Sequence, residues 1–298
     1  MLVPPITDER TFSKVMGELL DVANLIIGEK PFLISYINER TFKSLKVMNH
    51  EVFTEGMMVP IEKTYCHQVY KNKKPTVVPN IENAVQDDRK EKVKRLNLYS
   101  YAGVPILLGD GSVFGTFCVF DQQPNMFDEK TISILEKLAS FLAYAIDMQI
   151  INAKDPLTGL YNRRFWDKVY DDLPEHDGVH SIAIMDLDSL KQVNDQLGHE
   201  TGDQLIRTFS RIIHETIPWD AYGFRIGGDE FSIVFYNKNT DQSKPFIDEI
   251  MTKCHHADIK LSAGMTDTQK TPYENLVTRA DQLLYEAKSK GKNQLSEG

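Results

Sequence analysis

A long helix expected in the middle of the chain constrains the fold most, because it divides the sequence into two halves. The helix begins near Asp128 and is expected to stop at Asp155-Pro156, since proline cannot continue a helix and restricts the residue before it. The 298 residues are about twice the usual length of one domain. We therefore expect one domain over residues 1–150, with residues 128–154 as a linking helix, and a second over residues 152–298.

Two rows of apolar side chains follow this helix. The first has the alternating spacings of three and four that are typical of a coiled coil, and consists of Ile132, Leu135, Ala139, Leu142, Ile146, Gln149 and Ala153. The second consists of Ile134, Leu138, Phe141 and Ala145. A helix packed only on its own domain is the simpler interpretation. We expect the helix both to cover a sheet and to pair with a second copy of the chain.

Composition and charge exclude several classes of protein. Residues 1–154 carry 18 Lys and Arg against 19 Asp and Glu, whereas residues 155–298 carry 16 against 24, and the whole chain has a formal charge of −9. An acidic second half argues against nucleic-acid binding, which needs cations facing phosphates. No run approaches the roughly 18 apolar residues that span a bilayer, and the first residues lack the pattern of a secretion signal, so no membrane association is expected.

Three cysteines, Cys66, Cys118 and Cys254, lie far apart in the sequence. An odd number at such spacing is no disulfide framework, which favours a reducing compartment and predicts a cytoplasmic protein. Cys66-His67 and Cys254-His255-His256 contain metal-binding residue types, but neither has a second ligand pair at zinc spacing. We interpret all three as ordinary cysteines.

Strand and helix patterns predict an α/β (α+β) fold for both halves. The first half is expected to contain a helix over residues 8–28, strands over 31–37, 43–47, 75–78, 101–108 and 114–120, and a hairpin at the Asp-Gly pair within 109–112. The second is expected to contain strands over 181–186, 221–226, 231–236 and 259–264, and helices over 189–197, 202–216, 243–254 and 274–289. This second set describes a sandwich with an antiparallel hairpin.

Carboxylates gather at two predicted strand ends in the second half. Asp186 and Asp188 come where an apolar strand stops, and Asp229 and Glu230 directly follow a double glycine in the hairpin. If the hairpin lies beside the first strand, these acids converge and repel one another, which divalent cations relieve. Glycines without Cβ atoms would let a bulky ligand approach the backbone. A turn that merely carries surface acids is the alternative.

Five ordered motifs resemble the GGDEF family of diguanylate cyclases. The hairpin motif is Arg225-Ile226-Gly227-Gly228-Asp229-Glu230-Phe231. The other resemblances lie at residues 155–164, at 186–195 with Gly198-His199 and Gly202-Asp203 after it, at 262–264 and at 280–293. Together they cover essentially all of residues 152–298. The resemblance implies a nucleotidyl-cyclase-like sandwich with a catalytic β-hairpin.

The resemblance also implies a metal site and a reaction. Asp186, Asp229, Glu230 and the carbonyl of Leu187 would hold two Mg²⁺ or Mn²⁺ ions. Two GTP molecules, one on each domain of a homodimer, would be joined into cyclic di-GMP with release of two pyrophosphates. Asp229 and Glu230 would be the catalytic residues that help to deprotonate the 3′-hydroxyl, without a decision between them.

Eight further positions are implied to bind GTP. Backbone amides at a helix start would hold phosphates, with a lysine beside them, and two lysines near the end of the chain would bind the outer phosphates. Polar side chains on the two helices after the first strand would read guanine. These residues are Ser189, Leu190, Lys191, Asn194, His199, Asp203, Lys288 and Lys292. Lys292 stands where relatives often have arginine.

The first half resembles a GAF domain at Tyr65-Cys66-His67 and at residues 75–80, 101–106 and 115–121. GAF domains commonly bind a small molecule over a five- or six-stranded sheet and dimerise through terminal helices. The resemblance therefore implies a sensor whose unidentified ligand changes how two catalytic domains meet. A GAF domain that only dimerises is an alternative. For the second half, a catalytically silent GGDEF domain that only binds nucleotide, and an enzyme that makes a mixed dinucleotide, are alternatives.

Overall fold

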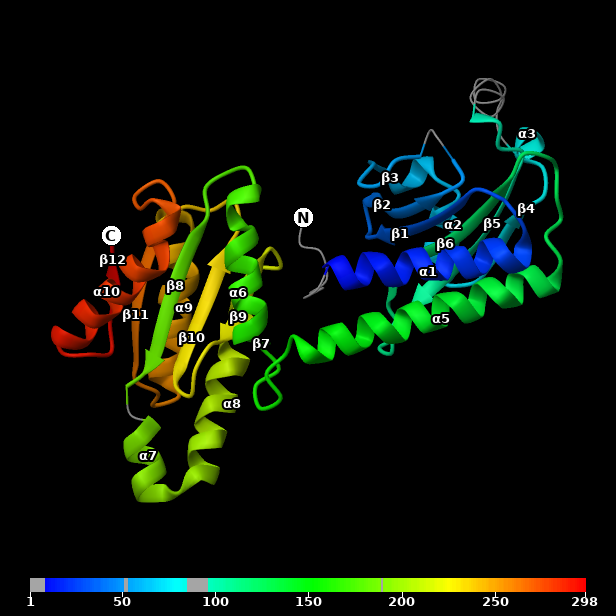
Figure 1. The fold of residues 1–298 in the computed structure, drawn as a ribbon. Coiled ribbons are helices and arrows are strands. Elements are labelled where there is room, and N and C mark those ends of the chain that lie inside the picture. The colour runs from blue at the N-terminus through cyan, green and yellow to red at the C-terminus, as the bar shows by residue number, and fades with distance from the viewer. Residues whose placement is uncertain (1–8, 51–52, 85–95, 189) are drawn as a thin grey trace. The chain divides into compact units, whose positions relative to one another are not determined.

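A computed structural model of the chain describes residues 9–50, 53–84, 96–188 and 190–298. The chain separates into two compact units that divide between Gln149 and Ile150 (Figure 1). Both units combine a sheet with helices, which confirms the predicted α/β class. Within the described residues, no helix has the length and apolar character needed to cross a membrane.

A six-stranded antiparallel sheet forms the centre of the first unit, with strand order β3-β2-β1-β6-β5-β4. Its strands are β1 (Phe32–Ile37), β2 (Thr41–Met48), β3 (Met58–Pro60), β4 (Thr76–Val78), β5 (Ser100–Leu107) and β6 (Val113–Asp121). Its helices are α1 (Glu9–Ile27), α2 (Cys66–Asn72), α3 (Ile81–Ala84) and α5 (Glu129–Asn152), with a 3₁₀ turn at Ile61–Lys63. The short elements β3, α2 and α3 lay outside the sequence prediction, because three to seven residues are too few to show a period.

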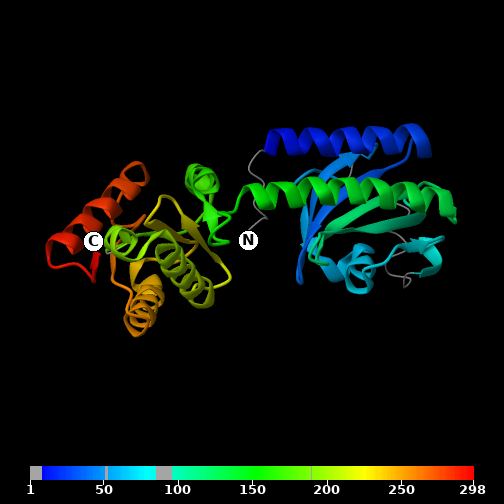
Figure 2. The same cartoon turned by 90° about the horizontal axis from the view of Figure 1, so that it is seen from below.

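Helices cover both faces of this sheet. Helices α1 and α5 lie on one face and α2 and α3 on the other (Figure 2). The first layer is fixed by ring contacts such as Phe12 of α1 against Phe114 of β6, whose centroids are 6.5 Å apart. The second layer encloses a separate cluster that includes Cys66, Tyr101 and Cys118.

Helix α5 uses the predicted coiled-coil row within its own domain. Leu135, Ala139, Leu142 and Ile146 are buried, so this row covers the sheet as expected. The large apolar side chains that α5 leaves in solvent are Phe141, Tyr144, Met148 and Ile151, which are 67%, 67%, 37% and 62% exposed. Phe141, Tyr144 and Met148 form a neighbouring row at spacings of three and four, which Ile151 continues. The helix ends at Asn152, two residues before the predicted end.

A second six-stranded sheet, with order β12-β11-β8-β10-β9-β7, forms the centre of the other unit. Its strands are β7 (Tyr161–Asn162), β8 (Ser181–Leu187), β9 (Ala221–Arg225), β10 (Glu230–Phe235), β11 (Leu261–Asp267) and β12 (Leu295–Glu297). Its helices are α6 (Arg163–Asp172), α7 (Leu190–Leu197), α8 (His199–Thr216), α9 (Thr240–His256) and α10 (Leu276–Ser289), with 3₁₀ turns at Leu173–Glu175 and Tyr273–Asn275. Pairs β11–β12 and β7–β9 are parallel, and the other pairs are antiparallel.

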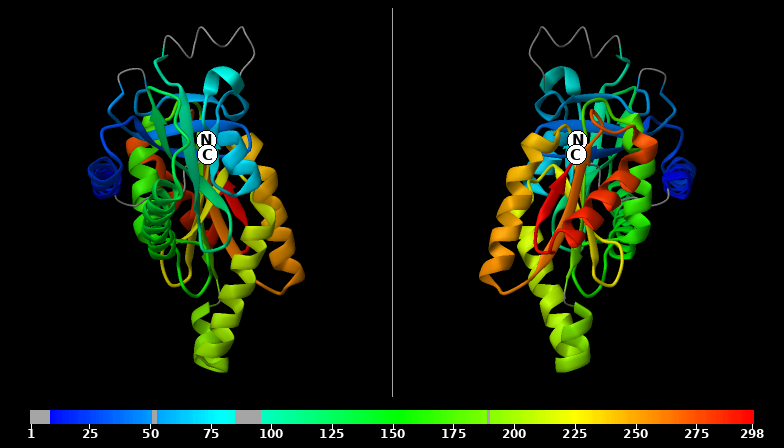
Figure 3. Two further views of the ribbon diagram at one scale, coloured as in Figure 1. Left: turned by 90° about the vertical axis from the view of Figure 1, so that its right-hand side faces the viewer. Right: turned by 90° about the vertical axis from the view of Figure 1, so that its left-hand side faces the viewer.

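Strand β8 lies between β11 and β10, and each of its seven residues is buried. Its alternate side chains enter two cores. Ile182 and Ile184 pack with residues of α6 and α10, whereas Ala183 and Met185 pack with residues of α8 and α9. Helices α7 and α8 form a hairpin that extends beyond the body of this unit (Figures 1 and 3). Burial on both faces explains the unbroken apolar run of β8.

Candidate functional site

The predicted carboxylates meet where β8 ends beside the β9–β10 hairpin. Asp186 of β8 is the register partner of Glu230, the first residue of β10. Directly opposed residues of an antiparallel pair project from the same face, so both carboxylates leave the sheet on one side. The backbone N–H of Leu187 donates to the carbonyl oxygen of Asp229 at 3.1 Å. The structure therefore brings together all four residues that were expected to bind metal.

Asp186 is the most buried of these acids, with 8% of its surface exposed. Burial raises the pKa of this carboxyl group, and repulsion from Asp229 and Asp188 acts in the same direction. The ammonium of Lys288, 2.7 Å from its Oδ2, opposes that rise. A carboxylate under these conditions is stabilised by added positive charge.

The two glycines of the turn have different structural roles. A Cβ atom at Gly227 would lie 2.6 Å from Glu230 Oε2, so glycine there leaves room for Glu230 to lie over the turn. A Cβ atom at Gly228 would contact nothing within 4 Å, and Gly228 does not have a positive φ. The fold itself therefore places no requirement for glycine at position 228, where the backbone faces open space.

The donor chemistry of the site suits a hard divalent cation, although its ligands are not gathered into a closed cluster. Across the described ranges, no three His, Cys, Asp or Glu side chains are grouped to hold a metal ion. Glu230 lies against Gly227, and Lys288 contacts one oxygen of Asp186. Carboxylate and carbonyl oxygens on one sheet edge are nevertheless the ligands that Mg²⁺ and Mn²⁺ prefer.

Asp188 has a set of hydrogen-bond partners of its own. Its two oxygens accept hydrogen bonds from the hydroxyl of Ser262 at 2.9 and 2.8 Å, and one of them accepts from the backbone N–H of Asn293 at 3.0 Å. The side chain of Asn293 in turn accepts from the N–H of Leu261 at 3.2 Å. These bonds fasten the segment after α10 to strand β11.

That fastened segment presents Lys292. Gly291, Lys292 and Asn293 all have positive φ values, of 120°, 63° and 50°. Left-handed backbone is unfavourable for a lysine by roughly 1–2 kcal/mol, so neighbouring bonds must hold it. The N–H of Lys292 donates to the carbonyl of Ala287, and the side chain is exposed. Lys288 and Lys292 thus sit on either side of the helix end, one on Asp186 and one in solvent.

The start of α7 carries two of the predicted phosphate-binding residues, Leu190 and Lys191. Ser189 lies outside the described residues. Leu190 is the first residue of α7, and its side chain is buried in the core, so only its backbone is suited to a ligand. Lys191 follows on the first turn and is exposed.

The predicted guanine-binding residues lie on the α7–α8 hairpin. A Cβ atom at Gly202 would overlap the amide oxygen of Asn194, so glycine allows that side chain to lie against α8. Asp203, half-buried, directly follows Gly202. His199 is exposed at the first position of α8, after Gly198 with φ +86°. Helix packing thereby brings Asn194 to the segment that carries Asp203.

Arg225 connects the start of this unit with the hairpin turn, a role that we had not assigned. Its guanidinium donates to the carbonyl oxygen of Gly228 at 2.9 Å and to Asp155 Oδ1 at 3.3 Å. The same oxygen of Asp155 accepts from the N–H and the hydroxyl of Thr158. Both charged residues lie in motifs that were identified from the sequence. Their pairing could not be predicted, because they are 70 positions apart in the sequence.

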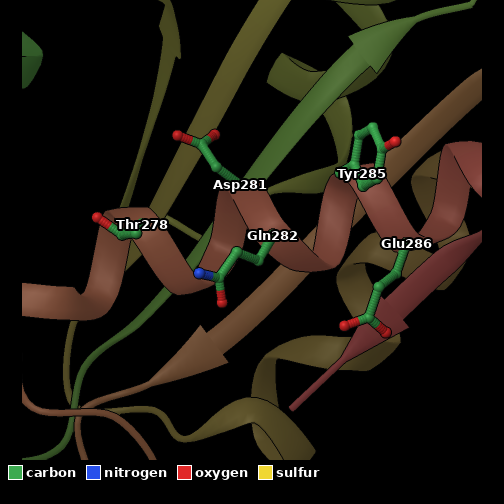
Figure 4. Close-up of a pocket in the computed structure, with 5 residues that line it drawn as sticks. All are labelled: Thr278, Asp281, Gln282, Tyr285 and Glu286. Atoms are coloured by element: carbon green, nitrogen blue, oxygen red, sulfur yellow. The ribbon is translucent and has the colours of Figure 1, made fainter.

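A shallow hollow lies on α10, away from these residues. Figure 4 shows that all five of its lining side chains come from this one helix: Thr278, Asp281, Gln282, Tyr285 and Glu286. Burial raises the pKa of Asp281, and Arg163 opposes the rise. None of the predicted site residues lines this hollow, which is one face of a helix.

Comparison with known families agrees with this division of the chain. A sequence model of the GAF domain matches residues 11–146, and a model described as diguanylate cyclase, GGDEF domain, matches residues 152–294. These matches define a two-domain protein in which a GAF domain precedes a GGDEF domain. The order of a GAF domain followed by a GGDEF domain, which the motifs had indicated, is thus confirmed.

Two curated relatives and one crystal structure illustrate the similarity. Diguanylate cyclase DgcS of Shewanella oneidensis is 30% identical over 171 residues, 54% of this chain and 57% of that protein. Diguanylate cyclase DosC of Escherichia coli K12 is 32% identical over 156 residues, 47% of this chain and 34% of that protein. The GGDEF domain of DgcB from Caulobacter crescentus, in complex with c-di-GMP, is 26% identical with a TM-score of 0.46, and covers 49% of this chain and 93% of that chain. The chain thus spans somewhat over half of the length of DgcS and about a third of the length of DosC.

Proposed function

We propose that this chain is a diguanylate cyclase that condenses two GTP molecules into cyclic di-GMP and two pyrophosphates. The observation that carries the proposal is the register of β8 and β10, which faces Asp186 with Glu230. The raised pKa of Asp186, caused first by burial and then by neighbouring acids, supports a site that needs added cations. The open space at Gly228 supports close approach of a ligand, because the fold does not otherwise need glycine there.

Two Mg²⁺ or Mn²⁺ ions would be held by Asp186, Asp229, Glu230 and the carbonyl oxygen of Leu187. When bound, such ions supply positive charge to the phosphates and to the attacking and leaving oxygens. Asp229 and Glu230 are the residues proposed to take the proton from the ribose 3′-hydroxyl. The 3′-oxygen forms a bond to the α-phosphorus of the other nucleotide, and pyrophosphate leaves.

The remaining predicted residues orient GTP. Lys288 and Lys292, near the end of α10, would bind the outer phosphates, where Lys288 exchanges its contact with Asp186 for a phosphate oxygen. Backbone amides of residues 189 and 190 with Lys191 would bind phosphate at the start of α7, as helix N-termini favour anions. Asn194 and Asp203 would hydrogen-bond to guanine, with His199 beside the same nucleotide. Asp203 accepts from the N–H edge of guanine, which disfavours a mixed dinucleotide.

The test is to incubate the purified chain with GTP and Mg²⁺ and to separate the products by chromatography. We expect cyclic di-GMP from the wild type, and at least a hundredfold less from Asp229→Ala because the variant loses charge stabilisation at the reacting phosphate. Asp177→Ala, an exposed acid in the loop before β8, is the matched control and should retain activity. GTP binding without product over a range of metal and protein concentrations would instead support the silent nucleotide-binding alternative.

We further propose that the chain works as a homodimer whose geometry the GAF domain controls, in response to a small-molecule ligand. The exposed row Phe141, Tyr144 and Met148 on α5 supports this, since three large apolar side chains at coiled-coil spacing fit a second copy of the same helix. Each catalytic domain holds one GTP, so two domains must face each other for the reaction.

The dimer proposal is tested with Phe141→Glu. A charge placed in an apolar interface should weaken dimer formation at least tenfold, and turnover should fall with it at low protein concentration. Sedimentation and activity measured over the same concentration series provide the readout. The matched control, Lys130→Glu, introduces a glutamate at an exposed position of α5 about three turns earlier. An unchanged dimer with Phe141→Glu would contradict the assignment of this row.

A further inference from the structure

Two cysteines that are 52 positions apart in the sequence meet in the core of the GAF domain. The Sγ atoms of Cys66 and Cys118 are 3.4 Å apart. Their residues are 3% and 0% exposed. Neither thiol has a role in the proposed cyclase reaction, and both are free cysteines.

Hydroxyl groups surround the pair. The Tyr101 hydroxyl donates to Cys66 Sγ at 3.5 Å and lies 3.4 Å from Cys118 Sγ. The thiol of Cys118 donates to Thr116 Oγ1 at 3.1 Å, and that oxygen is 2.8 Å from the hydroxyl of Ser35. All five residues are buried, so the thiols belong to a closed polar network inside an otherwise apolar layer.

The backbone makes room for this arrangement. Gly103 is the register partner of Cys118 in the β5–β6 pair. A Cβ atom at position 103 would overlap the hydroxyl and ring of Tyr101 and would lie 3.2 Å from Cys118 Sγ. Any side chain at this position would therefore displace the tyrosine hydroxyl from both sulfurs.

We propose that Cys66 and Cys118 are a redox-active dithiol that a hydroperoxide converts into an intrachain disulfide. In the first step the Cys66 thiolate attacks the peroxide, the O–O bond breaks, and a sulfenic acid forms with release of water or an alcohol. In the second step the Cys118 thiolate attacks that sulfur and water leaves. Overall, two thiols lose two electrons and two protons, and the peroxide gains both.

The surroundings distinguish the two sulfurs. Burial opposes ionisation of Cys66, but hydrogen bonding with Cys118, Thr116 and Tyr101 outweighs it and holds the pKa of Cys66 below its ordinary value. Burial raises the pKa of Cys118 well above that value. Cys66 is therefore the thiol that attacks first, because the thiolate is the nucleophile.

Helix α2 is the element that must move for the disulfide to form. A disulfide needs its sulfurs about 2.05 Å apart, so the present separation must shorten by roughly 1.4 Å. Cys118 lies in β6, which is paired on both sides with β1 and β5. Cys66 is the first residue of the seven-residue helix α2, which packs on β5 and β6. Oxidation should therefore draw α2 towards the sheet.

The experiment treats the reduced full-length chain with hydrogen peroxide, alkylates the remaining thiols in denaturant, and maps the peptides by mass spectrometry without reduction. We expect the Cys66 and Cys118 peptides to be joined with loss of two hydrogens, Cys254 to remain alkylated, and dithiothreitol to restore both thiols. Because the readout is the bond itself, its result is independent of whether the chain makes cyclic di-GMP. Cys66 and Cys118 both still alkylated, or Cys66 joined to Cys254 or to another chain, would overturn the proposal.

A variant of the neighbouring tyrosine tests the chemistry of the first step. Tyr101→Phe removes the hydroxyl that donates to Cys66, and should slow oxidation about tenfold, as a shift of one pKa unit in the thiolate would. The final disulfide should still form. Tyr70→Phe, a tyrosine elsewhere on α2, is the matched control and should oxidise at the wild-type rate. Equal rates for wild type and Tyr101→Phe would contradict the role given to that hydroxyl.

Discussion

Two buried aspartates lie at opposite ends of the β8–β11 pair, and their hydrogen-bond and charge environments differ. Asp186, near the end of β8, is the partner of Ser262, and Asp267, at the end of β11, is the partner of Ser181. They are 8% and 1% exposed. Asp186 has one lysine contact and two acids nearby. Asp267 instead accepts four hydrogen bonds, from the N–H and the hydroxyl of Thr240 and from the backbone N–H groups of Gln269 and Lys270.

The difference appears in the direction of each pKa. Burial raises the pKa of Asp186, and the single lysine does not reverse that. Burial also disfavours ionised Asp267, but hydrogen bonds from Thr240, Lys270 and Gln269 outweigh it and lower the pKa. The fold completes the hydrogen bonds of Asp267 and leaves those of Asp186 incomplete. Asp267 is structural, whereas the charge of Asp186 lowers the stability of the fold, as is typical of functional sites.

The largest effect that tests this comparison is expected from Asp267→Ala. Removal of the carboxylate leaves the N–H and buried hydroxyl of Thr240 without an acceptor, so the free energy of unfolding should fall by about 3 kcal/mol. Because the pKa of Asp267 is lowered in the folded state, its contribution is present above the unfolded pKa and is lost as the pH falls. Urea titrations at neutral and acidic pH measure both, with exposed Asp177→Ala as control. Equal losses at both pH values would contradict a structural carboxylate.

A smaller effect is expected from Ser262→Ala, at the end of the β8–β11 pair that carries Asp186. This change removes the buried hydroxyl that donates to Asp188 and accepts from Asn293, and should cost about 1.5 kcal/mol. Because these bonds hold the segment that presents Lys292, the KM for GTP should rise several-fold with little change in kcat. Ser289→Ala, an exposed serine at the end of α10, is the matched control. A fall in kcat alone would argue against a role in phosphate positioning.

The smallest effect has the opposite sign. Asp186→Asn should raise the free energy of unfolding by about 1 kcal/mol at neutral pH while it abolishes cyclic di-GMP synthesis. A carboxyl group whose pKa is raised on folding binds its proton more tightly in the native state, so wild-type stability falls as the pH rises through the interval between the two pKa values. The stability gain of the variant should therefore shrink at acidic pH. A loss of stability at neutral pH would show that the Lys288 ion pair outweighs burial.

The end of β8 and the β9–β10 hairpin were predicted correctly because both depend on local sequence patterns. One pattern is an apolar run that stops at a carboxylate, and the other is a double glycine between two strands. Partners distant in sequence could not be predicted in this way. Asp188 was grouped with the acids of the site, but it binds Ser262, and only the β8–β11 register reveals this. The Cys66–Cys118 pair was missed for the same reason, since it depends on how α2 packs on the sheet.

The helix between the domains shows a different limit of periodicity. The spacing of the first apolar row is compatible both with a coiled coil and with a helix on a sheet, and the structure assigns Leu135, Ala139 and Leu142 to the sheet. Of the exposed row, Phe141 was identified from the sequence as part of an apolar row, but Tyr144 and Met148 were not identified. Which row faces solvent depends on the rotation of the helix about its axis, which tertiary packing decides.

The guanidinium of Arg225 has a mechanical consequence for the β9–β10 turn. It holds the carbonyl oxygen of Gly228 and the carboxylate of Asp155 at once, and Asp155 comes three residues after the last residue of α5. The side-chain amide of Asn162 also donates to the carbonyl of Asn152, at the end of that helix. The turn therefore cannot shift without pulling on the segment that leaves α5. A rotation of the chain at residues 152–155 would therefore be transmitted to Gly228 through the planar guanidinium of Arg225.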